Sequence, residues 1–364
     1  MKIGIVTFWT SKDNFGQILQ CYALQTLLRK MGHSPVLIRT KGSCSEIHSS
    51  LKLKIKSCVR KVLHLDCLRY GGKDFDKFLE NQISYTEKIY YSKNDFTPSE
   101  LGYDAIICGS DVVWSEGVGT GAWGELCFLD FFTSPIKKIS YAASFGASSL
   151  SKAFADFARE KILNFDAVSV REWSGVDICA QLGRNDAVSV CDPTLLLKKE
   201  DYEKLATKIE RKVCLGYFIG WPTDIPVDEI RAYASKKNLK FSRLNCQISK
   251  SSIKNLLISP KTIPEWLATY ANADCIFTNS FHGTIFAILF NKPFIFLPIK
   301  GSAAKLNNRV ENLLNQLNLT ERIWNSCISI KEQMDRSVNW EKVNADVEKW
   351  NHFSIEWLKN ALKA

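Results

Sequence analysis

Ser280, His282 and Gly283 are the residues of this chain whose types and spacing are best suited to chemistry. They follow a predicted buried strand at 274–277 and precede an apolar segment at 284–290 that is predicted to be helical. In open parallel sheets, ligands bind beyond the carboxyl ends of the strands, where a helix N-terminus attracts anions. Imidazole titrates near neutral pH, so His282 could bind a phosphate as a cation or pass it a proton. The alternative is a histidine that caps its own helix.

Polar residues also stand near the ends of predicted strands in the first half of the chain. Asn14 and Gly16 precede the first predicted helix, where asparagine could bond a hydroxyl and glycine permits close backbone approach. Ser110 and Asp111 end another predicted strand. Aspartate suits sugar hydroxyls or general-base catalysis, although this pair could equally cap a helix.

Three basic residues extend this set. Arg171 ends a predicted strand beside Glu172, so it could bind a carboxylate or phosphate, or simply pair with the glutamate. Lys305 and Arg309 follow a glycine-containing loop and open a further predicted helix. Each of these three residues, taken alone, is typical of a charged residue on the protein surface. Together with His282 they predict a basic pocket for an anion with more than one negative group.

Several common enzyme motifs are absent from the sequence. It has no GxxxxGK[ST], GxSxG or HExxH, and no GxGxxG after a strand. This argues against P-loop hydrolysis, serine hydrolysis, zincin chemistry and dinucleotide binding. The 12 cysteines are scattered, with no CxxC pair and no Cys/His ligand spacing. We therefore expect reduced core cysteines in a cytoplasmic protein, and no metal.

The composition is that of a globular protein. Of 364 residues, 46% are hydrophobic and 24% charged, and the length suggests two domains. We expect no membrane span and no signal peptide. The net charge of +10 is concentrated in residues 29–73, where the segment 52–61 could form a basic amphipathic helix against the inner face of the membrane, or a solvated surface. Nucleic-acid binding is not expected, because no aromatic-rich basic motif accompanies the charge.

Predicted strands alternate with predicted helices on both sides of Asp192. This pattern predicts an α/β fold of two Rossmann-like, doubly wound domains facing across a cleft, at 1–192 and 193–330. Residues 331–364 carry tryptophan and valine at helical spacing, which predicts a C-terminal helix that packs back on a domain. Its tryptophans are expected in the core, not in a ligand platform.

Six blocks of this chain, in this order, resemble the polysaccharide pyruvyl transferase family. An ordered set of this kind is more specific than any single motif. The resemblance covers roughly residues 1 to 325. The matching blocks are Asn14–Gln25, Gly109–Trp114, Tyr141–Gly146, Val168–Glu172, Asp192–Leu196 and Ser280–Gly283.

The resemblance implies a glycosyltransferase-B-like arrangement with an acceptor side in the first domain and a donor side in the second. It implies phosphoenolpyruvate as donor, no cofactor, and as acceptor a sugar, free or lipid-linked, of a bacterial cell-surface polysaccharide or its precursor. The product would be a pyruvate ketal. By motif, His282 would be the catalytic or phosphate-contacting histidine and Arg171 a ligand of the donor anion. Arg309 matches an arginine that often follows the histidine block, and Lys305 is placed by proximity only.

The remaining candidates divide between the two substrates. Ser280 and Gly283 are expected on the donor side, and Asn14, Gly16, Ser110 and Asp111 on the acceptor side. One alternative is a glycosyltransferase that uses a nucleotide sugar, which would need a ribose-binding carboxylate, with Glu311 as the only nearby candidate. The other alternative is a non-catalytic glycan-binding relative, because a fold alone does not determine function.

Overall fold

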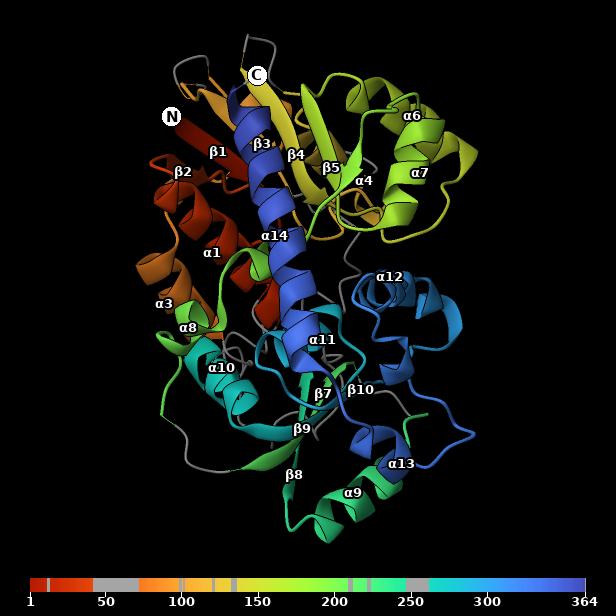
Figure 1. Cartoon of the computed structure of the whole chain (residues 1–364). Helices are drawn as coiled ribbons and strands as arrows, with labels where there is room; N and C mark the ends of the chain where they lie inside the picture. Colours follow the sequence, from red (N-terminus) through yellow and green to blue (C-terminus); the bar gives the residue numbers. More distant parts are fainter. Residues whose placement is uncertain are drawn as a thin grey trace, which may run out of the picture.

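The protein is described from a computed structural model of the chain (Figure 1). The structure describes residues 1–11, 14–41, 72–97, 100, 102–119, 122–131, 136–208, 212–220, 224–246 and 262–363. The basic segment predicted at 52–61 lies outside these residues. Within the described residues, no helix is both long and apolar enough to cross a membrane.

The first half of the chain forms a parallel sheet with the strand order β2-β1-β3-β4-β5-β6. Alternate residues of β1 face opposite sides: Ile3 and Ile5 join one apolar cluster, and Val6 joins another. Because both faces are buried, this is a doubly wound sheet. Its strands are β1 (Lys2–Val6), β2 (Ser34–Leu37), β3 (Ala105–Cys108), β4 (Lys137–Ala143), β5 (Ala167–Val170) and β6 (Val188–Ser189).

Helices cover both faces of this sheet. The face with Ile3 and Ile5 is covered by α1 (Phe15–Lys30) and α3 (Gly72–Gln82). The opposite face is covered by α5 (Ala122–Cys127), α6 (Lys152–Ile162) and α7 (Trp173–Gln181). The short elements η1 (Lys93–Asp95) and α4 (Glu116–Gly119) complete this half.

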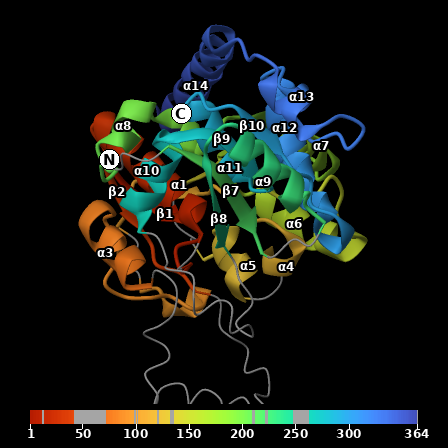
Figure 2. The ribbon, with the colours of Figure 1, turned by 90° about the horizontal axis from the view of Figure 1, so that it is seen from below.

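The second sheet is also parallel, with the order β10-β9-β7-β8. On β7, Cys214 and Phe218 face one apolar cluster, whereas Leu215 and Tyr217 face the other. Seen from below, α9 and α10 lie on opposite sides of β7 and β8 (Figure 2). The elements are β7 (Val213–Ile219), α9 (Val227–Lys236), β8 (Lys240–Cys246), α10 (Ile263–Ala271), β9 (Ala273–Thr278), α11 (Phe281–Leu289), β10 (Phe294–Phe296), η5 (Gly301–Asn307), α12 (Asn308–Gln316), η6 (Thr320–Arg322) and α13 (Ile330–Asp335).

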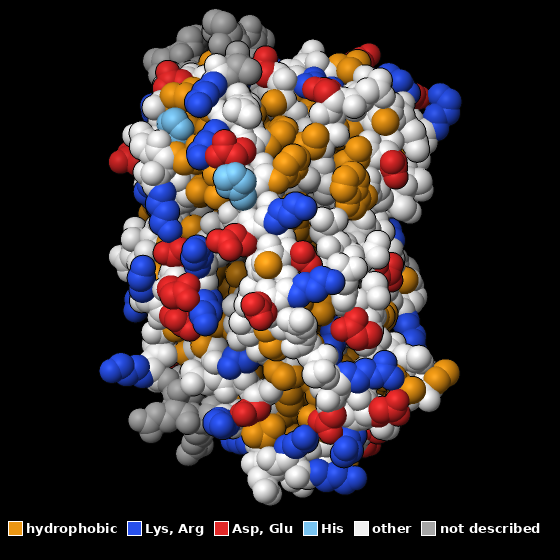
Figure 3. Space-filling model, viewed as in Figure 1, with side chains coloured by type: hydrophobic (Ala, Val, Ile, Leu, Met, Phe, Trp, Pro, Cys, Tyr) orange, Lys and Arg blue, Asp and Glu red, His pale blue; other side chains and the backbone are white. Residues whose placement is uncertain are grey.

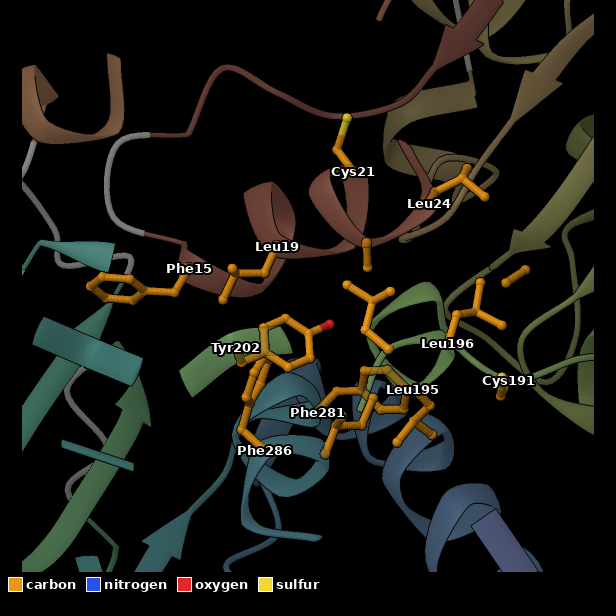
Figure 4. Close-up of a cluster of buried hydrophobic side chains, with 14 of the residues drawn as sticks. Phe15, Leu19, Cys21, Leu24, Cys191, Leu195, Leu196, Tyr202, Phe281 and Phe286 are labelled. Atoms are coloured by element: carbon orange, nitrogen blue, oxygen red, sulfur yellow. The ribbon is translucent and has the colours of Figure 1, made fainter. Parts of the chain in front are cut away.

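One apolar cluster joins the two halves of the chain. Phe15 of α1 stacks on Trp266 of α10, with ring centroids 5.1 Å apart and planes at 9°. Leu195 lies in η3 (Pro193–Leu196), and Tyr202 lies in α8 (Lys199–Glu203). Both fill the space between α1 and α11, where Phe281 also lies (Figure 4). The halves therefore share a core, although each has its own sheet.

Helix α14 (Trp340–Lys363) runs from the second half back onto the first sheet (Figure 1). Its 24 residues span about 36 Å. The backbone N–H of Cys191 donates to the Ser354 hydroxyl at 3.0 Å, and the Lys137 ammonium donates to the Leu362 carbonyl at 3.2 Å. On the face that carries α14, acidic and basic side chains are interspersed (Figure 3). The predicted C-terminal helix is confirmed.

The strand and the helix predicted before and after His282 are confirmed, with small changes in their limits. The strand extends to Ala273–Thr278, and the helix begins at Phe281 because the Ser280 hydroxyl accepts a hydrogen bond from the Gly283 N–H. The tryptophans of α14 pack partly buried against the shared core, as expected. The domain limits at 192 and 330 remain predictions; the first sheet ends at Ser189 and the second begins at Val213.

We expect Phe15→Ala to destabilise the whole molecule, because the ring is 7% exposed and stacks across the two halves. Truncating a buried phenylalanine costs about 3–5 kcal/mol. Urea unfolding followed by circular dichroism measures the loss. The matched control is Phe353→Ala on α14, a side chain 48% exposed, which should change the free energy of unfolding by about 0.5 kcal/mol or less. Equal losses in the two variants would contradict a shared core.

Candidate active site

The carboxyl ends of strands from both sheets meet in one buried polar cluster. Asp111 follows β3, Arg171 follows β5, and Asp192 follows β6. His282 lies in the first turn of α11, directly after β9. The side chains of Arg171 and His282 both come within 4 Å of Asp192, so the cluster joins the two halves of the molecule.

Asp192 is the centre of this cluster. One carboxylate oxygen, Oδ1, accepts hydrogen bonds from the Thr194 N–H at 3.0 Å and the Thr194 hydroxyl at 2.7 Å. The other, Oδ2, accepts from Arg171 Nη1 at 3.0 Å and lies 3.1 Å from the Ser110 hydroxyl. His282 Nε2 is 3.6 Å from the same oxygen. The carboxylate is therefore held from several sides.

Arg171 is surrounded by carboxylates. Besides Asp192, its guanidinium lies 3.7 Å from Asp111 Oδ1 and 3.8 Å from Glu172 Oε2. It also lies over the ring of Phe281, 4.3 Å from the centroid, in a cation–π contact. Its Nε and Nη2 atoms are buried and have no hydrogen-bond partner. Arg171 thus balances charge within the cluster, and two of its donor atoms are unused.

Burial and neighbouring charges shift the pKa values of Asp192 and Arg171 in opposite directions. Burial raises the pKa of the Asp192 carboxyl, but His282, Arg171 and Thr194 outweigh it and hold that pKa well below its usual range. Burial lowers the pKa of Arg171, but the carboxylates of Asp192, Asp111 and Glu172 more than reverse this. Asp192 and Arg171 are therefore both charged at neutral pH.

Arg309 is a buried cation of a different kind. It is 8% exposed, and it forms no ion pair with any carboxylate in the described part of the chain. Its Nε donates to the Leu306 carbonyl at 3.3 Å, and its guanidinium lies 5.7 Å from the centroid of Phe281. Burial, and then repulsion by Arg171, lowers the pKa of Arg309 to about 10, so it remains charged. A buried charge without a partner is costly and attracts an anion.

A narrow hollow between the two halves is lined by both arginines. It extends from α7 to α12 and α14, and its rim includes Trp173, whose indole N–H donates to Gln316 Oε1 at 3.3 Å. The residues that line it include Arg171, Glu172, Asp192, Phe281 and Arg309. Among the described residues, no group of three or more His, Cys, Asp or Glu side chains is arranged to hold a metal ion.

Gly16 explains how His282 fits against the first half. A Cβ placed on Gly16 would lie 2.1 Å from both Cγ and Nδ1 of His282, far inside van der Waals contact. Gly16 is in the first turn of α1, so the start of this helix packs directly on the imidazole of the other half. The glycine at this position is therefore required by a contact between the two halves.

The other predicted site residues are largely engaged in local structure. The Ser280 hydroxyl caps α11 by accepting from the Gly283 N–H, and the Cα of Gly283 packs towards Thr278. Asn14 caps α1 by accepting from the Gln17 N–H at 3.3 Å. These capping contacts were not predicted for Ser280 or Asn14, and they occupy the groups proposed for substrate.

Ser110 and Lys305 have opposite surroundings. Ser110 is fully buried, and its hydroxyl lies 2.9 Å from the Ala142 carbonyl oxygen as well as near Asp192. Lys305 is exposed on η5 and forms no described contact with the cluster. The structure therefore brings Asp111, Arg171, His282 and Arg309 together, whereas Lys305 stays at the surface.

Two carboxylates of the cluster, Asp192 and Glu172, were not among the functional residues predicted from the sequence. Asp192 was noted only as part of a motif and a domain junction, and Glu172 only as a neighbour of Arg171. Glu172 accepts a hydrogen bond from the Ser144 hydroxyl at 2.6 Å, and its other oxygen, Oε2, is buried without a hydrogen-bond partner. The signal for Asp192 was its place just after a strand, the same signal that marked Arg171. The expected basic pocket is in fact a mixed cluster of arginines and carboxylates.

Solved structures with a similar fold cover the whole chain. A protein from Listeria monocytogenes assigned as a UDP-N-acetylglucosamine 2-epimerase has a TM-score of 0.54 at 10% identity, over 100% of this chain and 95% of its own. The UDP-GlcNAc 2-epimerase from Neisseria meningitidis bound to UDP-GlcNAc gives 0.48 at 11%, over 99% and 100%. At these identities the likeness concerns the fold alone. The fold is two Rossmann-like domains in a glycosyltransferase-B-like arrangement, as predicted.

A comparison with curated proteins gave no significant match. A family model for polysaccharide pyruvyl transferases matches residues 14–301. This range begins at the cap of α1 and includes Asp111, Arg171, Asp192 and His282. The resemblance noted in the sequence is thereby confirmed: the chain belongs to the polysaccharide pyruvyl transferase family.

Proposed function

We propose that the protein transfers pyruvate from phosphoenolpyruvate to two hydroxyl groups of a sugar, forming a pyruvate ketal and releasing phosphate. The sugar belongs to a bacterial cell-surface polysaccharide or its precursor. The observation that carries the proposal is Arg309, a buried guanidinium that forms no ion pair with any described carboxylate. It lies over Phe281, the residue that precedes His282 in the chain. An anionic group of the donor would give Arg309 the ion-pair partner that it lacks, next to an acid.

Phosphoenolpyruvate fits this arrangement because it carries a phosphate and a carboxylate. Arg309 binds one anionic group, since a guanidinium matches either group with two parallel hydrogen bonds. The charge of Arg171 is already met by Asp192, Asp111 and Glu172, so its unused donor atoms can orient the donor but add little net charge. The main anion ligand is therefore Arg309.

The chemistry requires an acid. Protonation of the donor at C3 makes C2 electrophilic, and the oxygen of one sugar hydroxyl then bonds to C2 and loses its proton. The C2–O bond to phosphate breaks, phosphate leaves with a proton, and the second hydroxyl closes the ring in the same way. His282 as imidazolium provides the first proton, a contribution typically worth about 10²- to 10⁴-fold in rate. Asp111 and Glu172 are carboxylates suited to sugar hydroxyls.

A nucleotide-sugar glycosyltransferase gains no specific support from the site. The carboxylate that it would need, Glu311, is exposed on α12 and does not line the hollow. The donor experiment below separates the two reactions directly.

Phosphoenolpyruvate should raise the melting temperature of the wild type, and Arg309→Gln should abolish the shift because it removes the unpaired charge. A ligand at 100 times its dissociation constant adds about 2.7 kcal/mol of stability, which corresponds to a few degrees. Thermal denaturation with phosphoenolpyruvate and with a panel of nucleotide sugars measures this. The matched control is Arg159→Gln, an exposed arginine on α6, which should keep the shift. A shift with a nucleotide sugar alone would reject the pyruvyl donor.

His282→Gln should lower turnover by about 10²- to 10⁴-fold while leaving donor binding intact, because glutamine cannot supply the proton. Phosphate release, followed with saturating phosphoenolpyruvate and an acceptor glycan, gives the rate, and the melting shift gives binding. Full turnover in this variant would exclude His282 as the acid.

Gly16→Ala should lower turnover without loss of fold, because the added Cβ displaces the imidazole and alanine is a good helix former. The assay is again phosphate release, with circular dichroism as the test of folding. The matched control is Gly117→Ala, where a Cβ meets nothing within 4 Å. Unchanged turnover in Gly16→Ala would show that the close contact has no functional role.

A further inference from the structure

We propose that Trp173 is the platform on which a pyranose ring of the acceptor glycan stacks, and that Asn312 and Gln316 of α12 bind the hydroxyl groups of that ring. The inference rests on the proposed function in assuming that a sugar is the acceptor, and it names where that sugar binds. Binding of a sugar at this place can be measured without donor and without turnover.

Trp173 is an exposed aromatic residue at the rim of the hollow. It is the first residue of α7 and is 55% exposed, whereas the preceding residue, Glu172, is 1% exposed. The indole is held in place, because its N–H donates to Gln316 Oε1 at 3.3 Å. This hydrogen bond engages an edge of the ring, and within the described residues no aromatic ring or cation stacks on its face. The C–H groups on one side of a pyranose pack on such an electron-rich face.

Amide side chains lie on the α12 side of the same rim. Helix α12 lies next to α7 (Figure 1), and Asn308, Asn312 and Gln316 are four positions apart, so they share one face of it. Asn308 Nδ2 donates to the Ser174 hydroxyl at 2.7 Å, and Asn312 Nδ2 donates to Asn308 Oδ1 at 2.8 Å. Asn312 and Gln316 also line the hollow.

Two groups of these amides remain for a ligand. Asn312 Oδ1 and Gln316 Nε2 form no hydrogen bond with any residue that the structure describes. One is an acceptor and the other is a donor, and a sugar hydroxyl both donates and accepts. A flat aromatic face with a few fixed polar groups beside it is suited to a sugar, because one side of the ring is apolar and its edge carries hydroxyls.

The depths of the groups in the hollow suit two substrates of different size. Arg309 is 8% exposed, so the anionic group of a small donor can reach it only inside the hollow. A ring that belongs to a glycan is attached to other groups and has to stay at the rim, where Trp173 lies. Glu172 connects the two levels, because it precedes Trp173, lines the hollow, and has a buried Oε2 without a hydrogen-bond partner. A hydroxyl that points from the stacked ring into the hollow can donate to this oxygen.

The residues that the sequence predicted for the acceptor do not compete for this role. The described residues that line the hollow do not include Asn14, Gly16, Ser110 or Asp111. Trp173 carries no motif signal of its own, and only the position of α7 beside α12 shows that it lies at the entrance to the buried arginines.

The test is saturation-transfer nuclear magnetic resonance of the full chain with a panel of methyl hexopyranosides and methyl N-acetylhexosaminides, with and without phosphoenolpyruvate. At least one sugar should bind the wild type, with the strongest transfer to the C–H protons of one ring face. Trp173→Ala should raise the Kd of that sugar about tenfold or more, because it removes the apolar stacking surface. Trp173→Phe, which keeps a ring, should raise it about threefold or less.

Asn312→Ala is the second variant, and it should raise the Kd about two- to tenfold through the loss of one hydrogen bond. It carries the test if Trp173→Ala does not fold, since urea unfolding of each variant shows which of them keep the wild-type stability. The matched control is Tyr91→Ala, which removes another exposed aromatic side chain, 45% exposed and not among the residues described as lining the hollow. Its Kd should stay within twofold of the wild type.

Three results would overturn the inference: no binding of any sugar in the panel to the wild type, a Kd within twofold of the wild type in both Trp173→Ala and Asn312→Ala, or an equal change in Tyr91→Ala. The arm without phosphoenolpyruvate separates this inference from the proposed function. Sugar binding that depends on Trp173, in a protein whose melting temperature does not respond to phosphoenolpyruvate, would contradict the proposed function alone. A melting shift with phosphoenolpyruvate and sugar binding that does not depend on Trp173 or Asn312 would contradict this inference alone.

Discussion

The compensation of the buried Asp192 carboxylate is the constraint on which the site depends. An ionised carboxylate in a low-dielectric interior is stable only when donors and positive charges surround it. The chain supplies them from four places: Thr194 next to it, Ser110 after β3, Arg171 after β5, and His282 at the start of α11. To surround the carboxylate in this way, the ends of β3, β5 and β6 must lie together. The start of α11, from the second half, must lie against them.

The apolar core makes this alignment possible. Phe15 and Gly16 are neighbours in the first turn of α1, and they contact different parts of the second half: Trp266 by stacking and His282 by close approach. The polar contact therefore lies at the edge of a large apolar contact. Hydrophobic burial stabilises the contact between the halves without fixing their relative orientation. The hydrogen bonds and ion pairs of the cluster depend on geometry, so they fix that orientation.

The sequence could predict where each residue lies along its own sheet, because strand and helix periods show which residues follow a strand end. That was sufficient for His282, Arg171 and the two-domain fold. It could not predict that three carboxylates gather around Arg171, since this depends on which strand ends and loops lie side by side after folding. For the same reason Lys305, close to Arg309 in sequence, points to solvent one helical turn before the residue that is buried. At Asn14 and Ser280 the sequence could not distinguish helix capping from ligand binding, because both functions use the same residue types.

Helix α14 gives the chain a second covalent crossing between the halves, after the first at η3. Asp192 caps η3 and so adjoins the first crossing, while the Ser354 contact to Cys191 places α14 beside it. The charged cluster therefore lies close to a place where the chain passes from one half to the other. Any rotation of one half against the other would move the outer edges of the two sheets further than Asp192 and His282, which lie beside this connection.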